Sequence, residues 1–349
     1  MIFASDNWAG ASPRVMAALT KAAEGTAPAY GNDSETAAVS RAMSDLFERD
    51  VVVRLVPSGT AANMLALAAL TPAHGVIFAH DDAHVLLDEC GAVELATDGA
   101  LVQGVPGVGG QISVEGIERA LERFPPHIRF RRPATVSLTQ ATECGTVYSL
   151  ADIRRLTDFA QEKGLKVHMD GARFANAVAA LGCSPADVTW RAGIDALSFG
   201  GTKNGALMAE AVVFFSDVNL EEFDRNRQRL GHGLSKMRPI ALQFLALLEN
   251  GHWLDLARHA NAMAARLGDR LMSVGHRLAW PVEANEVFVI LREAEITALR
   301  AAGARVSDWP SRNLATNTVL AADERVIRLV CSFATGEVEV ERFVTLAAR

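Results

Sequence analysis

The feature that most constrains the fold of this chain is the regular alternation of predicted strands and helices between residues 51 and 215. Short apolar runs such as 51–56 and 75–79 alternate with segments whose apolar residues recur at helical spacing, such as 150–162. Such alternation is typical of a parallel, doubly wound sheet that is covered by helices. Ligands bind at the carboxyl ends of the strands in these sheets, so polar residues at those ends are the first candidates for a site.

A second, smaller unit is predicted beyond this region. The chain has 349 residues, half of them hydrophobic, which is enough for a large α/β domain and a further domain. Residues 1–12 are expected to form an N-terminal arm and residues 13–245 the large domain. After a mainly helical stretch, strands and helices alternate again, and residues 246–349 are predicted to form a small α+β domain.

Charge and composition exclude several classes of protein. The formal net charge is −7 and the charges are interspersed, so no basic stripe for nucleic acid is present. The apolar runs are too short to span a bilayer and the N-terminus lacks a signal-like pattern, which favours a cytoplasmic protein without a membrane partner. The four cysteines form no CxxC pair and are expected to be core thiols. His80 and His84 lack a third ligand at a fitting spacing, so no metal site is predicted.

A lysine follows one of the buried strands at a position that does not suit a solvated surface charge. The apolar run 194–199 leads into Gly200-Gly201-Thr202-Lys203, and a further strand is predicted over 211–215. Such a lysine can form a Schiff base with a carbonyl, and pyridoxal phosphate is the cofactor that typically provides one. Taken alone, this pattern is more often an ordinary loop lysine.

An aspartate at the end of another predicted strand favours the cofactor role of Lys203 over that of an ordinary loop lysine. The apolar run 165–169 is followed directly by Asp170. A carboxylate beside the pyridine nitrogen of pyridoxal phosphate keeps that nitrogen protonated, which the cofactor needs in order to accept electrons. Asp170 could instead cap a following helix. An aspartate and a lysine at two strand ends are nevertheless what a parallel sheet would supply to this cofactor.

A strand, a turn of small residues and a helix start predict an anion site further upstream. The strand 51–56 is followed by Ser58-Gly59-Thr60 and by a helix from Ala61. Free backbone N–H groups at such a helix start bind phosphate, Gly59 lets the backbone come close, and the two hydroxyls can donate. Simple N-capping by Ser58 or Thr60 is the alternative.

Together these segments resemble the threonine aldolase family of pyridoxal-phosphate enzymes, which has the aminotransferase-like fold (fold-type I). The resemblance extends over essentially the whole chain. It implies an α/β large domain with a mostly parallel sheet and a smaller α+β C-terminal domain. The motifs that carry it are Ser58–Asn63, His84 with Asp88–Gly91, His168–Arg173 and Phe199–Gly205.

The resemblance implies a cofactor role for several residues. Lys203 would form the Schiff base, and Asp170 would pair with the pyridine nitrogen. His84 would stack on one face of the ring, and Ala172 would lie against the other. The residues that would hold the phosphate are Ser58, Gly59, Thr60 and, after the lysine, Arg238.

The resemblance also implies that a serine and two arginines bind the substrate carboxylate. Ser5, Arg173 and Arg328 stand at the matching positions, and Arg173 also counts among the cofactor-site residues. An unpaired arginine would be costly in the apolar strand around Arg328, whereas a bidentate carboxylate suits its geometry. Tyr30 matches a tyrosine that reaches the cofactor from a neighbouring subunit. A homo-oligomer is therefore expected, at least a dimer and in its fuller form a dimer of dimers.

The reaction that the resemblance implies is retro-aldol cleavage of L-threonine or L-allo-threonine to glycine and acetaldehyde, with low specificity at the β-carbon. His84 is the first candidate base for the hydroxyl proton; His127 could orient that hydroxyl or could equally be a surface residue. The family's Asn-Thr-His and Gly-Gly-Gly-Met-Arg-Gln runs are replaced by residues 139–146 and 231–239, so phenylserine or another β-hydroxy-α-amino acid stays open as substrate. A β-eliminating lyase or an aminotransferase would share the cofactor residues, and a non-catalytic pyridoxal-binding protein is a further alternative.

Overall fold

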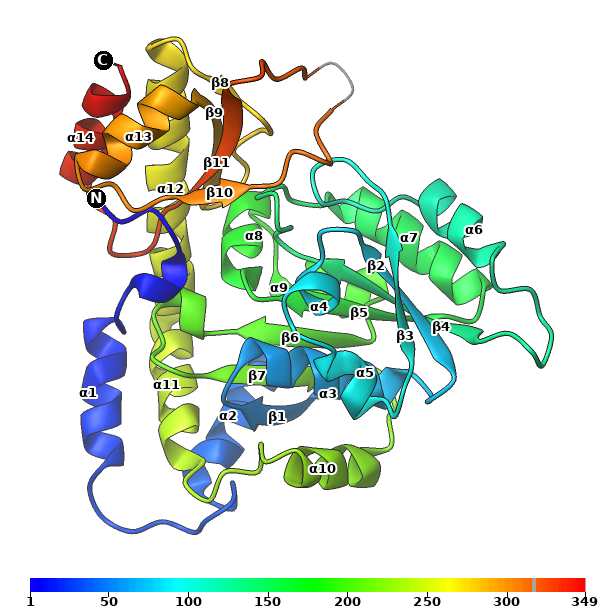
Figure 1. Cartoon of the computed structure of the whole chain (residues 1–349). Coiled ribbons are helices and arrows are strands. Elements are labelled where there is room, and N and C mark those ends of the chain that lie inside the picture. The colour runs from blue at the N-terminus through cyan, green and yellow to red at the C-terminus, as the bar shows by residue number, and fades with distance from the viewer. Residues whose placement is uncertain (316–317, 349) are drawn as a thin grey trace.

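The computed structural model describes residues 1–315 and 318–348, and within them the strands form two sheets (Figure 1). The larger sheet joins seven of the described strands in the order β1-β7-β6-β5-β4-β2-β3. These strands are Val52–Val56 (β1), Gly75–His80 (β2), Leu101–Val105 (β3), Arg132–Thr139 (β4), Lys166–Gly171 (β5), Ala196–Gly200 (β6) and Glu210–Phe214 (β7).

The strands of the larger sheet are mostly parallel. β3, β2, β4, β5 and β6 run parallel to one another, whereas β7 pairs antiparallel with both β6 and β1. The predicted α/β class with a mostly parallel sheet is confirmed, but the wholly parallel alternation expected up to residue 215 is wrong for β7. Only residues 201–209 join β6 to β7, and so short a connection returns the chain antiparallel instead of crossing the sheet.

Helices cover both faces of this sheet. They are Pro13–Ala22 (α1), Ser34–Leu46 (α2), Gly59–Leu70 (α3), His84–Leu87 (α4), Ala92–Ala96 (α5), Val114–Leu121 (α6), Leu150–Glu162 (α7), Phe174–Leu181 (α8), Pro185–Val188 (α9), Leu220–Arg229 (α10) and Arg238–Leu248 (α11).

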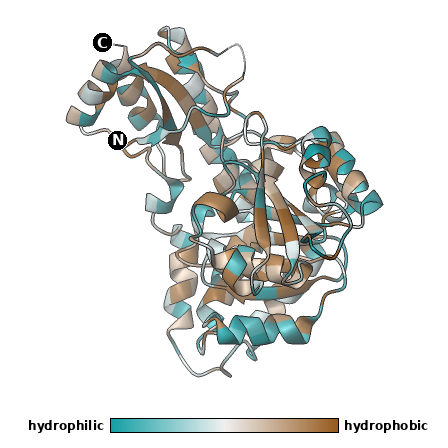
Figure 2. Cartoon of the chain, turned by 45° about the vertical axis from the view of Figure 1, so that its right-hand side comes forward, coloured by the Kyte–Doolittle hydropathy of each residue, from teal (hydrophilic) through white to brown (hydrophobic). Residues whose placement is uncertain are grey.

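Alternating strand residues divide the core of this part into two apolar layers. Ile77 belongs to the layer that includes residues of α3, α5 and α10, whereas its neighbour Phe78 belongs to the layer that includes residues of α1, α2, α6, α7, α8 and α11. Successive side chains of a strand point to opposite faces, so a strand that is buried on both faces is apolar throughout. Figure 2 shows the hydrophobic strands inside and the hydrophilic α10 on the outside.

The second sheet lies at the end of the molecule that carries both termini (Figure 1). Its antiparallel strands have the order β10-β11-β9-β8, and α12 contacts α8 of the larger part as well as β9 and α14. The predicted boundary at residue 245 falls inside α11, so a division at that point stays a prediction. The elements here are His252–Ser273 (α12), Arg277–Leu278 (β8), Glu286–Arg292 (β9), Glu293–Ala301 (α13), Ser307–Trp309 (β10), Glu324–Val330 (β11) and Glu337–Ala347 (α14).

The N-terminal arm is fixed to the small sheet. The backbone N–H of Phe3 donates to the Arg305 carbonyl at 2.9 Å, and the N–H of Val330 donates to the Phe3 carbonyl at 2.8 Å. The Phe3 ring is buried edge-on against Phe343. This anchoring delivers the next residues of the arm, from Ser5 onward, to the cavity described below.

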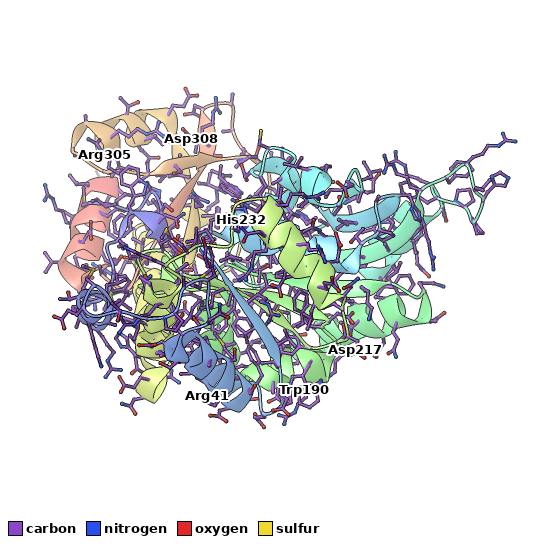
Figure 3. The ribbon with its side chains drawn as sticks, turned by 90° about the horizontal axis from the view of Figure 1, so that it is seen from below. Arg41, Trp190, Asp217, His232, Arg305 and Asp308 are labelled. Atoms are coloured by element: carbon purple, nitrogen blue, oxygen red, sulfur yellow. The ribbon has the colours of Figure 1, made fainter. Side chains whose placement is uncertain are left out.

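The surface carries charges of both signs. Seen from below, Arg41 and Trp190 lie along one edge of the molecule, whereas Arg305 and Asp308 lie along the opposite edge near the small sheet (Figure 3). None of the described helices combines the length and apolar character that a membrane crossing demands. Of the cysteines expected in the core, Cys144 and Cys331 are buried, Cys183 is partly buried and Cys90 is exposed, so that expectation is wrong for Cys90.

Candidate active site

A cavity of about 530 Å³ opens at the carboxyl ends of the parallel strands. Loops that follow β4, β5 and β6 meet there with the N-terminal arm, the turn before α3 and part of the small sheet. This is where an open α/β sheet is expected to bind its ligand. The predicted site residues that line the cavity are Ser5, Ser58, Gly59, Thr60, His84, Asp170, Ala172, Arg173, Lys203 and Arg328.

Two glycines determine the path of the loop that carries Lys203. A Cβ atom on Gly200 would lie 2.7 Å from the carbonyl oxygen of Ala172. A Cβ atom on Gly201 would lie 2.7 Å from the carbonyl oxygen of Ala209. Both distances are shorter than a side chain tolerates, so only glycine lets this loop pass so close to its neighbours. The Gly-Gly pair of the sequence thus brings Lys203 to the end of β6.

The surroundings of Lys203 favour its neutral amine. Burial, and next the charge of Arg173, lower the pKa of Lys203 below its ordinary value, although Asp6 and Asp170 act in the opposite direction. The neutral amine is the form that attacks a carbonyl carbon.

Asp170 is buried at the end of β5, and both its oxygens accept hydrogen bonds. Oδ1 accepts from the backbone N–H of Ala172 at 2.9 Å, and Oδ2 accepts from Asn63 Nδ2 at 2.7 Å. The alternative role as a helix cap is not seen, because the next helix, α8, has Arg173 at its N-cap position. The two hydrogen bonds fix the direction in which the carboxylate faces the cavity.

The turn Ser58-Gly59-Thr60 forms the N-terminus of α3. Ser58 caps that helix, since its Oγ accepts from the backbone N–H of Ala61 at 3.2 Å. A Cβ atom on Gly59 would meet no other atom within 4 Å, so the space in front of this backbone is open. The capping alternative and the anion-site prediction are therefore compatible, because the cap uses one N–H and leaves open space beside the helix start.

The imidazole of His84 is held from one side by a buried carboxylate. Its Nδ1 lies 2.8 Å from Oε1 of Glu89, and that hydrogen bond raises the pKa of His84 above its ordinary value of 6.5. Asn63 donates to the same oxygen at 2.8 Å and also to Asp170, so one amide connects the two carboxylates. With Nδ1 engaged, Nε2 is the nitrogen of His84 that is available to a further partner.

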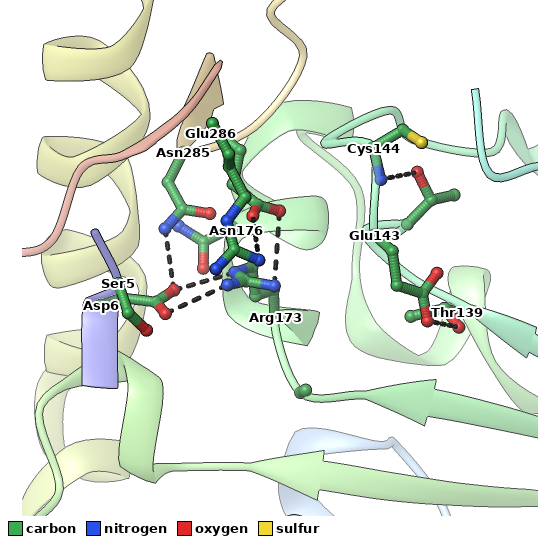
Figure 4. Close-up of polar contacts among 12 residues, drawn as sticks. Ser5, Asp6, Thr139, Glu143, Cys144, Arg173, Asn176, Asn285 and Glu286 are labelled. Atoms are coloured by element: carbon green, nitrogen blue, oxygen red, sulfur yellow. Dashed lines mark hydrogen bonds and ion pairs between the residues drawn. The ribbon is translucent and has the colours of Figure 1, made fainter. Parts of the chain in front are cut away.

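Two buried carboxyl groups of the cavity were not singled out from the sequence. Glu143 Oε1 accepts from the backbone N–H of His84 and from Thr139 Oγ1, each at 2.9 Å (the second is drawn in Figure 4). Glu210 accepts from two backbone N–H groups of the lysine loop at 3.3 and 3.4 Å. Burial raises the pKa of each to about 7. The signal that could have found them is an acidic residue in the loop after a buried strand, as for Glu143, or at the first position of one, as for Glu210.

The guanidinium of Arg173 lies between two carboxylates (Figure 4). It donates to both oxygens of Asp6, from Nε at 2.8 Å and from Nη2 at 3.1 Å, and its Nη1 lies 3.3 Å from Oε2 of Glu286. Both acids are buried, and Asn285 also donates to Asp6 at 3.1 Å. The sequence led us to expect Arg173 to bind a substrate carboxylate, and that role stays a prediction; the two acids that hold it were not anticipated. Little in the sequence indicated this pairing, since Asp6 and Glu286 are 280 residues apart.

Arg328 has looser contacts. Its Nη2 donates to the Ala4 carbonyl at 3.4 Å, its Nη1 lies 4.0 Å from Oε1 of Glu286, and its guanidinium carbon lies 4.8 Å from the centre of the Trp309 ring. Ser5 lines the same cavity. Arg328 thus keeps more of its donors for a ligand than Arg173 does.

Three predicted residues do not join the cavity of this chain. His127 is exposed on the segment between α6 and β4, which projects from the molecule (Figure 1). The Tyr30 side chain is 57% exposed. Arg238 donates to Glu35 at 2.9 Å and to the Glu24 carbonyl at 2.9 Å, so its guanidinium is engaged elsewhere. The structure therefore does not bring His127 or Arg238 to the cavity from within the chain; a reach from a neighbouring subunit, as expected for Tyr30, stays a prediction.

Comparison with known proteins decides the family. The sequence pattern of the β-eliminating lyases matches residues 3–294. The chain belongs to the β-eliminating lyase family. A low specificity L-threonine aldolase from Pseudomonas aeruginosa is 44% identical over 305 residues, which cover 87% of this chain and 88% of that protein. The resemblance to the threonine aldolases is thereby confirmed.

Solved structures agree with this membership. The threonine aldolase from Leishmania major superposes with a TM-score of 0.89 at 27% identity, over 99% of this chain and 98% of that one. A structure of the enzyme SPT with pyridoxal phosphate has a TM-score of 0.68 at 17% identity, over 100% and 86% of the two chains, which shows the fold alone. The predicted aminotransferase-like fold is confirmed.

Proposed function

We propose that the protein is a carbon–carbon lyase that cleaves L-threonine and L-allo-threonine to glycine and acetaldehyde with pyridoxal phosphate. The observation that carries the proposal is the meeting, in one cavity, of Lys203, Asp170, the open helix start at Gly59 and two arginines. Among the reactions that this fold can host, the choice is supported by the similarity to the threonine aldolases from Pseudomonas aeruginosa and Leishmania major.

The residues of the cavity fit the cofactor. The open space beside Gly59 suits a phosphate, the buried carboxylate of Asp170 suits a protonated pyridine nitrogen, and the lowered pKa of Lys203 suits Schiff-base formation. His84 and Ala172 would lie against the two ring faces. When bound, pyridoxal phosphate supplies an acceptor for the electron pair that the breaking Cα–Cβ bond releases.

The other side chains orient the substrate and move its proton. Arg328 and Ser5, with an N–H group of Arg173 that neither Asp6 nor Glu286 engages, would bind the α-carboxylate and so fix the rotation about Cα. His84 Nε2 would take the proton from the β-hydroxyl, because Glu89 engages Nδ1 and keeps the free nitrogen basic. Asp170 would hold a proton on the pyridine nitrogen throughout.

Low specificity is proposed at the β-carbon. The carboxylate is bound by several groups, whereas one imidazole serves the hydroxyl, directly or through a water that can reach either epimer. Leu207, Met208 and Trp309 add apolar surface to the lining, so phenylserine is a second candidate substrate. We also propose a homo-oligomer, at least a dimer, in which Tyr30 reaches the site of a neighbouring subunit.

The test is product analysis with purified protein loaded with pyridoxal phosphate. Equal amounts of glycine and acetaldehyde should form from L-threonine without a keto acid, and L-allo-threonine should react within about a hundredfold, a gap below about 3 kcal/mol. Preference for one epimer beyond about a thousandfold would contradict low specificity. Ammonia with 2-oxobutanoate would indicate β-elimination, a requirement for a keto acid would indicate an aminotransferase, and cofactor binding without turnover would indicate a binding protein.

A further inference from the structure

A buried carboxylate lies behind the two arginines of the cavity. Glu286 opens β9, and the residue is 1% exposed. Its Oε2 lies 3.3 Å from Nη1 of Arg173, and its Oε1 lies 4.0 Å from Nη1 of Arg328. It is therefore near both groups that are proposed to bind the substrate carboxylate.

The contacts of Glu286 differ from those of Asp6, the other acid on Arg173. Asp6 accepts two hydrogen bonds from Arg173 and one from Asn285. Neither oxygen of Glu286 accepts a hydrogen bond from the described residues. Asp6 is thus fixed in its charged form, whereas Glu286 has only the attraction of two arginines to offset its burial.

The charges of this cluster balance before a substrate binds. Arg173 and Arg328 carry two positive charges, and Asp6 and Glu286 carry two negative ones. An incoming α-carboxylate adds a third negative charge beside these two buried acids. An uncompensated buried charge is costly, so the cluster gains most by neutralising one of its own acids.

Glu286 is the acid that can accept the proton. Although burial raises the pKa of Asp6, Arg173 and Lys203 with the hydrogen bonds lower it overall. Burial raises the pKa of Glu286 above its ordinary value even though Arg173, Arg328 and Lys203 oppose it. Among the described residues, the Cys144 thiol also faces Glu286, and burial raises the pKa of that thiol, so it stays neutral; Glu143 and Asp88 act on Arg173 and Arg328 from farther away.

We propose that Glu286 is the resident counter-ion of the substrate-carboxylate site, ionised in the empty enzyme and protonated by one proton from solvent when an amino-acid carboxylate binds beside Arg173 and Arg328. No bond of the substrate changes in this step. Glu286 is a positioning residue, because it acts through the arginines. The inference rests on the proposed function for the identity of the ligand as an α-amino acid.

The consequence is a proton-linked affinity. A ligand that takes up one proton on binding loses up to about tenfold in affinity for each unit of rising pH, over the range between the Glu286 pKa of the free enzyme and that of the complex. Replacing Glu286 by glutamine removes both the charge and the proton. Glu286→Gln should therefore bind carboxylates more tightly at high pH and lose this component of the pH dependence.

The experiment is calorimetric titration of the cofactor-loaded enzyme with glycine in buffers of different ionisation enthalpy, which counts protons taken up. The wild type should take up about one proton more than Glu286→Gln. Glu143→Gln is the matched control, because Glu143 is also buried in the cavity lining with an unpartnered oxygen but contacts neither arginine. Equal counts for the wild type and Glu286→Gln, or a loss of the same proton in Glu143→Gln, would overturn the assignment.

Infrared difference spectra of the wild type provide a test that does not depend on the folding of Glu286→Gln. Glycine binding to the wild type should produce the carbonyl stretch of a newly protonated carboxyl group; its absence would refute the inference. The cofactor absorbance distinguishes a failure of this inference from a failure of the proposed function. A glycine-induced absorbance change without proton uptake would refute this inference alone. A protein that binds neither cofactor nor glycine would refute both the proposed function and this inference.

Discussion

The two ends of the cavity are built in different ways. At the cofactor end, Asp170 lies at the end of β5 and Lys203 lies in the loop after β6. Glycines and a backbone N–H group close in sequence help to fix their positions, and Asn63 of α3 also donates to Asp170. At the carboxylate end, Arg173 is held by Asp6 from the N-terminal arm and by Glu286 from the small sheet. The first end depends mainly on local structure, and the second depends on charges brought together from distant segments.

This difference teaches where each end is vulnerable. A change at the cofactor end removes a chemical group from a scaffold that other residues maintain. A change at the carboxylate end leaves a buried charge without its partner, which destabilises the fold as well as the site. Variants of the two ends should therefore separate into losses of activity alone and losses of activity with stability.

The largest effect is expected from Lys203→Ala. We expect kcat to fall by more than about a thousandfold, because the variant has no amine for the Schiff base, while the melting temperature stays close to that of the wild type. Activity assays and thermal denaturation measure the two quantities. In the wild type, borohydride reduction should attach the cofactor to Lys203, and Lys163→Ala, a surface lysine, should behave as wild type. Attachment to any other lysine would contradict the assignment.

Arg173→Ala and Arg328→Ala should differ in a way that breaks or confirms the comparison. Arg173→Ala leaves the buried Asp6 without its bidentate partner, so the free energy of unfolding should fall by about 3 to 5 kcal/mol. Arg328→Ala loses a donor to the substrate instead. The transition state should lose about 2 to 3 kcal/mol of stabilisation, so kcat/KM should fall roughly 30- to 150-fold, with little loss of protein stability. Chemical denaturation and substrate kinetics of both variants provide the test; equal stability of the two would show that Asp6 does not depend on Arg173.

A smaller effect is expected when Glu89 is replaced by glutamine. His84 acts as a base only when neutral, so the acidic limb of kcat/KM should lie above pH 6.5 in the wild type, because the hydrogen bond with Glu89 raises the pKa of His84. Glu89→Gln weakens that bond, so the limb should move to lower pH and the plateau should fall by less than about tenfold. Glu143, whose pKa is about 7, is the other possible source of the limb. A limb that moves only in Glu143→Gln would show that His84 is not the base.

The smallest effect is expected from His127→Ala. The residue is exposed and outside the cavity of its own chain, so kcat/KM should change by less than about threefold. Steady-state kinetics with both epimers of threonine, together with the mass in solution from light scattering, form the measurement. A loss well beyond that range in a dimer or tetramer would mean that His127 of another subunit enters the site, and the carboxylate end would then be completed across an interface.

Most of the fold could be predicted from the sequence. The bounds predicted for α7, residues 150–162, are those of the structure, because its apolar positions repeat at helical spacing and Ser149 caps its start. The reversal of β7 could not be predicted from periodicity, since a buried strand has the same apolar pattern in either direction. The short strands β8 and β10 were also missed, because two or three residues are too few to show an alternation of apolar and polar side chains.

For the site, the sequence by itself determined the groups that stand at strand ends. Lys203, Asp170 and the turn at Gly59 are fixed by patterns a few residues long, and any parallel sheet would gather them at one edge. Only the tertiary structure decided that Asp6 and Glu286 hold Arg173, that Glu89 holds His84, and that His127 and Arg238 lie elsewhere. The physical reason is range: backbone geometry acts over neighbours in sequence, whereas a buried ion pair joins whatever the folded chain brings within a few ångströms.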